Sequence, residues 1–252
     1  MINLHVSDGV ALVTILRPER RNALDAAHWM ELRAIFENLA QEDISGMIIT
    51  GTQDVFAAGA DIQQLVERKP LDALKSLAQS TLRSLEDLPF VSVAAINGHA
   101  LGGGCEIALA CDMRIAVPEA EIGLPEVGLG IIPGAGGTQR LPVIVGYAKA
   151  LELIITGQPV SGEEALRIGL VNRVTPQTSL LQEARQFVDV VGKQGRVAVS
   201  VARQVLKVGR SNSEAGMLLE RLASAAVYSS EEREYRMTKF LNKTKKGTKN
   251  ND

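Results

Sequence analysis

The stretch Val91-Ser92-Val93-Ala94-Ala95-Ile96-Asn97-Gly98-His99-Ala100-Leu101-Gly102-Gly103-Gly104-Cys105-Glu106 decides the fold, because it joins a strand pattern to a helix pattern. Its first six residues are apolar and often β-branched, which is typical of a buried strand. Residues 107–111, which follow it, are rich in helix formers. Three glycines therefore lie at the junction. Backbone N–H groups there can approach a ligand closely, and the start of a helix favours negative charge.

Two carboxylates accompany these glycines. Glu106 comes one turn after Gly103 on the same helical face, and Glu126 follows Pro125 in a loop-like segment. Backbone donors beside two carboxylates suggest carbonyl chemistry with an oxyanion intermediate. Taken alone, Glu106 could equally be a surface acid that the helix dipole stabilises, and Glu126 a solvated loop acid. The glycines could also simply allow close helix–strand packing.

The chain on either side of this stretch alternates strands with helices. An Asp8-Gly9 turn predicts a hairpin, and Asp25 is expected to cap a helix that carries Trp29 and Leu32. One long amphipathic helix is expected over residues 71–88, up to Pro89. Strands are expected at residues 2–6, 10–16, 47–51, 91–96 and 113–117. This alternation favours parallel strands joined by crossover helices, an α/β fold.

The later part of the chain is mostly helical in pattern. Ser161, followed by Glu163 and Glu164, is expected to cap one of these helices. The division between core and helices could fall near Gly146 or near Gly195. Helices are expected at residues 149–155, 161–168, 180–191, 197–208, 213–226 and 231–241.

Composition limits the class of partner. The chain has 252 residues, 46% of them hydrophobic and 22% charged, with a net charge of −2. These values are ordinary for a soluble globular protein and give no reason to expect nucleic acid or a membrane surface as a partner. Cys105 and Cys111 would lie on different faces of one helix, so no disulfide is expected. A signal peptide and a spanning segment are not expected either, and we expect a cytoplasmic protein.

Three motifs resemble the enoyl-CoA hydratase/isomerase (crotonase) family, and the resemblance covers almost the whole chain. They are Phe56-Ala57-Ala58-Gly59-Ala60-Asp61-Ile62, the run from Asn97 to Glu106, and Gly123-Leu124-Pro125-Glu126 with the segment from Ile132 to Leu141. The resemblance implies a spiral core of ββα units over residues 1–195. It also implies a helical C-terminal region over residues 196–252 that packs homotrimers or a dimer of trimers.

The resemblance also implies roles for particular residues. The N–H groups of Ala60 and Gly103 would form an oxyanion hole for a thioester carbonyl. Glu106 would hold and activate water, and Glu126 would give a proton to the α-carbon. Because both carboxylates are present, hydration of a 2-trans-enoyl-CoA is favoured. Double-bond isomerisation, thioester hydrolysis, decarboxylation, and coenzyme A binding without turnover remain the alternatives.

The family's acyl-CoA site would extend beyond the four catalytic groups. The resemblance to family trimers places Lys239 and Lys243 near a neighbouring subunit's coenzyme A, and a solvated helix face is the other interpretation. No metal or redox cofactor is implied, because amides activate the thioester; Cys105, His5, His28 and His99 are expected to be structural. Leu124 stands where the family often has Gln, which could change the acyl pocket. Residues expected to bind the coenzyme A thioester are Arg20, Ala58, Ala60, Asp61, Ile62, Gln63 and Gly103.

Overall fold

A computed structural model describes residues 1–67, 69–209, 213–228, 231–232 and 235–237. The chain divides into two compact units, Met1–Asp189 and Val190–Asp252. The boundary that the sequence analysis placed after residue 195 lies inside the second unit, and as a functional division it stays a prediction.

The first unit is built on a six-stranded sheet with the strand order β1-β2-β3-β5-β7-β10. The hairpin of β1 and β2 is antiparallel, and every other pairing is parallel, as the alternation of strands and helices predicted. Residues Asp8 and Gly9 form the hairpin turn, both with positive φ. The strands are β1 (Ile2–Ser7), β2 (Val10–Ile15), β3 (Gly46–Thr50), β5 (Val91–Ile96), β7 (Met113–Ala116) and β10 (Arg173–Val174), of which β10 was not predicted.

A second, smaller sheet was not predicted by the strand patterns, because its strands are too short to show an alternation. Its order is β4 (Val55–Ala57), β6 (His99–Leu101), β8 (Glu121–Gly123) and β9 (Val160–Ser161). Strands β4, β6 and β8 run parallel, so their carboxyl ends meet at one edge. The loops that leave that edge begin at Ala58, Gly102 and Leu124. The small sheet therefore brings the three sequence motifs together.

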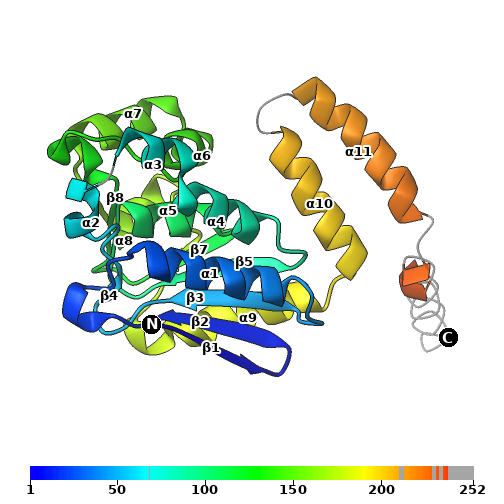
Figure 1. Ribbon diagram of the computed structural model, residues 1–252. Helices are drawn as coiled ribbons and strands as arrows, with labels where there is room; N and C mark the ends of the chain where they lie inside the picture. Colours follow the sequence, from blue (N-terminus) through cyan, green and yellow to red (C-terminus); the bar gives the residue numbers. More distant parts are fainter. Residues whose placement is uncertain (68, 210–212, 229–230, 233–234, 238–252) are drawn as a thin grey trace, which may run out of the picture. The chain divides into compact units, whose positions relative to one another are not determined.

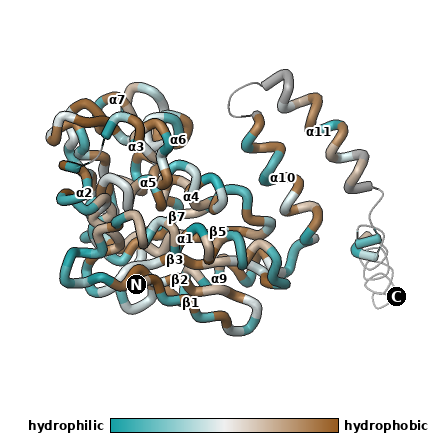
Figure 2. Tube along the Cα trace, viewed as in Figure 1, coloured by the Kyte–Doolittle hydropathy of each residue, from teal (hydrophilic) through white to brown (hydrophobic). Residues whose placement is uncertain are grey.

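Helices cover the larger sheet. Helices α1 (Ala26–Leu39) and α4 (Leu77–Glu86) run side by side in Figure 1. Figure 2 shows hydrophobic residues concentrated along β2, β3 and β5, the centre of the first unit's core. The remaining helices that begin in this unit are α2 (Ile62–Glu67), α3 (Pro70–Lys75), α5 (Gly103–Ala110), α6 (Gly137–Val145), α7 (Tyr147–Thr156), α8 (Gly162–Arg167) and α9 (Leu180–Gly192), whose last three residues belong to the second unit, with short 3-10 helices η1 (Pro18–Arg20), η2 (Pro125–Leu129) and η3 (Gln177–Ser179).

Both predicted caps are confirmed. Asp25 Oδ1 accepts a hydrogen bond from His28 N at 3.1 Å, and Ser161 Oγ accepts one from Glu164 N at 3.2 Å. The single helix expected over residues 71–88 is wrong. Ser76, with φ 20° and ψ 79°, ends α3 and begins α4. The Ser76 hydroxyl donates a hydrogen bond to Gly134 O at 3.0 Å. The helical pattern of residues 71–88 carries no sign of this contact with a distant residue.

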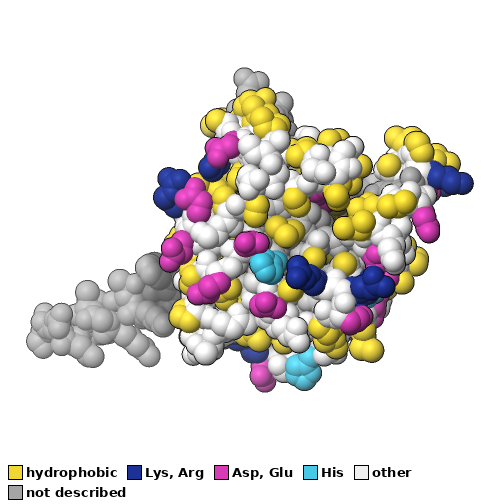
Figure 3. All heavy atoms as spheres, turned by 90° about the vertical axis from the view of Figure 1, so that its left-hand side faces the viewer, with side chains coloured by type: hydrophobic (Ala, Val, Ile, Leu, Met, Phe, Trp, Pro, Cys, Tyr) yellow, Lys and Arg dark blue, Asp and Glu magenta, His cyan; other side chains and the backbone are white. Residues whose placement is uncertain are grey.

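The exposed surface beside α2 and α3 is partly apolar. Figure 3 views the side of the molecule where α2 lies and shows hydrophobic side chains among acidic and basic ones. Within these two helices, Ile62, Val66, Leu71 and Leu74 are exposed.

Cys105 and Cys111 are both buried and form no disulfide, as the sequence analysis predicted.

The second unit contains α10 (Arg196–Gly209) and α11 (Ser213–Tyr228), which pack against each other. Figure 2 shows hydrophobic and hydrophilic residues alternating along α10. The predicted helix over residues 231–241 is described only in part, and Lys239 and Lys243 lie outside the described residues. None of the helices in the described part of the chain is long and apolar enough to cross a membrane.

Candidate active site

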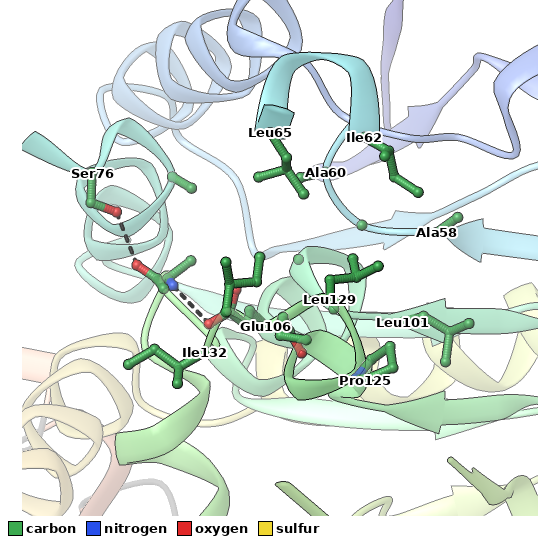
Figure 4. Close-up of a pocket in the computed structure, with 18 of the residues that line it drawn as sticks. Ala58, Ala60, Ile62, Leu65, Ser76, Leu101, Glu106, Pro125, Leu129 and Ile132 are labelled. Carbon is green, nitrogen blue, oxygen red and sulfur yellow. Dashed lines mark hydrogen bonds between the residues drawn. The ribbon is translucent and has the colours of Figure 1, made fainter. Parts of the chain in front are cut away.

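A cavity of about 240 Å³ lies at the carboxyl edge of the small sheet (Figure 4). Figure 4 shows Ile62 and Leu65 of α2 on one side of it, and Pro125 and Leu129 of η2 on the other. The cavity is lined by Trp29, Ala58, Gly59, Ala60, Ile62, Leu65, Ser76, Ala78, Leu101, Gly102, Gly103, Glu106, Pro125, Glu126, Leu129, Ile131, Ile132, Gly134 and Ala135. All four groups with a predicted catalytic role are among them.

The N–H group of Ala60 points away from Leu24, the residue with which Ala60 forms a parallel β-bridge. Leu24 N donates to Gly59 O at 2.7 Å, and Asp61 N donates to Leu24 O at 3.1 Å. These two bonds flank Ala60 in a parallel bridge, so its own N–H points to the opposite side. Gly103 is the first residue of α5, where an N–H has no intrahelical acceptor.

The two amide groups are neighbours. A Cβ placed on Gly103 would lie 3.7 Å from Ala60 N, and one placed on Gly59 would lie 3.2 Å from Gly103 N. Among the hydrogen bonds of the described residues, none has the N–H of Ala60 or Gly103 as its donor. Two unpaired donors at one point of a cavity wall are the arrangement that stabilises a developing oxyanion.

Two further glycines make this wall possible. Gly102 has φ 52° and ψ −121°, a backbone conformation that residues with a Cβ rarely adopt. It turns the chain from β6 into α5. Gly104 lies where a Cβ would be 2.1 Å from Ala57 O, so α5 approaches β4 too closely for any side chain.

Glu106 is held by the loop that precedes α6. Its side chain is buried, with the residue only 3% exposed, and Oε1 accepts hydrogen bonds from Ala135 N at 2.7 Å and Gly137 N at 2.9 Å. These two donors orient the carboxyl group. Ser76 Oγ donates to Gly134 O at 3.0 Å. The Gly134 carbonyl and the Ala135 N–H belong to one peptide group, so Ser76 holds the same peptide that holds Glu106 (Figure 4).

Glu126 has a different environment. Burial, together with the negative charge of Glu106, raises the pKa of Glu126 to about 7. Its Oε2 atom is buried and has no hydrogen-bond partner among the described residues. A carboxyl group in these surroundings carries a proton near neutrality and can donate it into the cavity.

The other predicted binding residues lie outside this lining. Asp61 caps α2, since its Oδ1 accepts from Gln63 N at 3.1 Å and its Oδ2 lies 3.2 Å from Arg17 Nη2. Arg20 and the side chain of Gln63 are exposed on η1 and α2. Their contacts with coenzyme A stay predictions.

Comparison with known proteins adds to this geometry. The family model described as "Enoyl-CoA hydratase/isomerase" matches residues 5–250. This chain belongs to that family. A short-chain-enoyl-CoA hydratase of Clostridium acetobutylicum is 40% identical over 96% of this chain and 95% of its own. A crotonyl-CoA hydratase of Syntrophomonas wolfei is 36% identical over 97% and 96%. The crystal structure of an enoyl-CoA hydratase from Bacillus anthracis superposes with a TM-score of 0.91 at 35% identity, covering 96% of each chain.

Membership of the enoyl-CoA hydratase/isomerase family confirms the predicted fold class, a crotonase-like α/β core followed by helices. Leu124, which stands where the family often has Gln, is fully buried against Gly137 and is not among the residues that line the cavity, so its effect on the acyl pocket stays a prediction. Sequence patterns missed three contributors to the site, Trp29, Ser76 and Ala135. The sequence predicts whether each of these residues lies in a helix or a loop, but no local pattern predicts that their side chains or amides meet at this cavity.

The peptide shared by Ser76 and Glu106 gives a first prediction for this family member. Ser76→Ala should lower kcat by about two- to tenfold with little change in KM, the effect expected for losing one hydrogen bond. The reason is that the Gly134–Ala135 peptide would lose the bond that fixes it against Glu106. Steady-state kinetics on an enoyl-CoA measures both constants.

The chain offers a matched control for this variant. Ser76 also caps α4 through Gln79 N, at 3.3 Å, and Ser161, which does not line the cavity, caps α8 in the same way. Ser161→Ala should therefore destabilise the fold by a similar amount, about 1 kcal/mol, without lowering kcat. Equal kinetic effects of the two variants would contradict the positioning role of Ser76.

Proposed function

We propose that this protein catalyses the reversible addition of water to a 2-trans-enoyl-CoA, giving a 3-hydroxyacyl-CoA. The observation that carries the proposal is the convergence of two free amides and two carboxyl groups on one cavity. The hydratase names of its relatives, at 36 and 40% identity over nearly the whole chain, support the same reaction.

Ala60 and Gly103 would bind the thioester oxygen. When water adds to the β-carbon, negative charge moves onto this oxygen as an enolate forms. Two fixed N–H donors stabilise that charge, and one such donor is worth about 3–4 kcal/mol. Because the amides polarise the thioester directly, we expect the reaction to need no further cofactor.

Glu106 and Glu126 would divide the proton transfers. The Glu106 carboxylate accepts a proton from water as the oxygen attacks the β-carbon. The neutral Glu126 carboxyl delivers a proton to the α-carbon, and its pKa of about 7 supports that role. Before hydration Glu126 holds the proton, and after hydration Glu106 holds it. The pair therefore carries one proton in both states.

The decisive experiment measures hydration of crotonyl-CoA by the purified protein, with the product identified. We expect the 3-hydroxy product with kcat in the ordinary range of about 1–10³ s⁻¹, unchanged after treatment with a chelator. A 3-enoyl-CoA offered in parallel tests isomerisation. Failure to hydrate any of several 2-enoyl-CoA substrates would overturn the proposal.

Assembly and location complete the proposal. We expect a homotrimer or a dimer of trimers that works in the cytoplasm on a free acyl-CoA thioester, without nucleic acid or membrane partners. Exposed apolar side chains on α10 and α11, among them Leu206, Met217 and Leu222, support association through the second unit. Light scattering of the purified full chain measures the assembly directly.

A further inference from the structure

Trp29 occupies an unusual place for a large core residue. It lies on α1, is 6% exposed, and lines the catalytic cavity. Its Cζ2 atom would be 3.3 Å from a Cβ on Gly103, so the indole lies beside the amide that would bind the thioester oxygen. The hydroxyl of Thr81 on α4 donates to the Trp29 carbonyl at 3.2 Å and ties this part of α1 to α4.

A second hollow, of about 380 Å³, adjoins the catalytic cavity. Four residues line both: Trp29, Ala60, Leu65 and Ala78. Since two of the four are alanines, the indole of Trp29 and the side chain of Leu65 supply most of the bulk between the two spaces. These two side chains therefore form part of the boundary that the two spaces share.

The lining of the second hollow shows which part of a substrate could enter it. Its lining includes the carboxylates of Asp25, Asp61, Glu67 and Asp72, and no lysine or arginine among the described residues lines it. Asp25 and Asp61 each face Arg17, at 3.3 and 3.2 Å, so the net negative charge of this lining comes from Glu67 and Asp72, and it disfavours the phosphates of coenzyme A. The same lining includes Leu24, Leu65 and Leu77, whose apolar side chains suit a hydrocarbon chain.

The catalytic cavity itself is small. Sites that bury whole drug-sized ligands usually measure about 300–1,000 Å³. The 240 Å³ here must hold the acyl group together with the thioester end of the pantetheine arm. With the carbonyl oxygen at Ala60 and Gly103, an acyl chain directed toward Trp29 would meet the boundary that the two spaces share, beside Gly103.

We infer that Trp29 determines acyl-chain length by closing the acyl end of the cavity, which restricts the enzyme to short-chain enoyl-CoA substrates. This inference rests on the proposed function for its substrate class. The second hollow is the space that a longer chain would occupy if the indole were absent.

The test compares kcat/KM for trans-2-enoyl-CoA substrates of four, six, eight and ten carbons. The wild type should prefer the four-carbon over the eight-carbon substrate by at least about tenfold, because even one methylene group in an apolar pocket gives discrimination of this size. Trp29→Leu should raise the eight-to-four ratio by at least about tenfold. Trp29→Ala should raise it further, and Trp29→Leu keeps the test valid if the alanine variant does not fold.

Phe36→Leu is the matched control. Phe36 is 1% exposed on the same helix, and it lines neither space. This variant should leave the ratio unchanged, which separates loss of the wall from general loosening of α1. A ratio that stays constant in Trp29→Leu, or an equal fall on every chain length, would overturn the inference.

Calorimetric binding of butanoyl-CoA and octanoyl-CoA to the same variants distinguishes this inference from the proposed function. The ratio of octanoyl-CoA affinity to butanoyl-CoA affinity should rise in Trp29→Leu by a factor similar to that expected for kcat/KM. This rise does not depend on whether the protein catalyses hydration. A wild type that binds both ligands but hydrates none of the trans-2-enoyl-CoA substrates would defeat the proposed function alone. An unchanged affinity ratio would defeat the role of Trp29 alone.

Discussion

Glu126→Gln is expected to lower kcat for crotonyl-CoA hydration by about 10²- to 10⁴-fold, the usual contribution of a positioned general acid. The amide has nearly the shape of the carboxyl group but cannot deliver its proton to the α-carbon. KM should change little, because Glu126 is not a predicted ligand of the thioester oxygen or of coenzyme A. Steady-state kinetics with product identification measures the loss.

The pH profile gives this prediction a second readout. The neutral form of Glu126 is the active one, so wild-type kcat/KM should fall as the pH rises through about 7. Because the two acids share one proton throughout, the hydration and dehydration directions should show the same profile. The residual activity of Glu126→Gln should lack this alkaline limb. If the alkaline limb persists in Glu126→Gln, the pKa that controls wild-type kcat/KM belongs to another group.

Unfolding of the Glu126→Gln variant would not account for the expected loss of kcat. Burial raises the pKa of Glu126 above that of an unfolded chain, about 4.3. The stability contributed by its neutral form is therefore complete below that value and is lost as the pH rises to about 7. A glutamine has no charge to bury, so at pH 8 the variant should melt no lower than the wild type. Thermal unfolding at pH 5 and pH 8 checks this comparison.

Much of the scaffold could be predicted because its signals are local. The Asp8-Gly9 turn needs only adjacent residues, and the caps at Asp25 and Ser161 act on amides three residues along the chain. The buried strand of residues 91–96 is long enough to show its apolar run. Each of these features stabilises the structure through contacts within one short segment.

The parts that could not be predicted depend on distant contacts. The break at Ser76 is bonded to Gly134, 58 residues away, and no helical pattern contains that information. Glu106 is held by the amides of Ala135 and Gly137, 29 and 31 residues along, whose small side chains give no sign of this contact. Trp29 fits a helical core pattern equally well whether it faces the sheet or the cavity. Tertiary packing alone decides these cases.

Glu106→Gln should also lower kcat by about 10²- to 10⁴-fold, for a different reason. A glutamine oxygen can still accept the bonds that Ala135 N and Gly137 N give to Oε1, so the loop should keep its place. The variant lacks the negative charge and basicity that draw a proton from water. Because the charge of Glu106 contributes to the raised pKa of Glu126, the alkaline limb of the residual activity should move to lower pH.

The double variant Glu106→Gln, Glu126→Gln decides whether the two acids act as one unit. If each proton transfer needs the other, removing the second acid costs little once the first is gone, as happens for catalytic groups that work together. We therefore expect the double variant to be within about tenfold of the slower single variant. Losses that multiply instead would show two independent contributions, and a Glu106→Gln enzyme within about threefold of wild type would exclude Glu106 as the base that activates water.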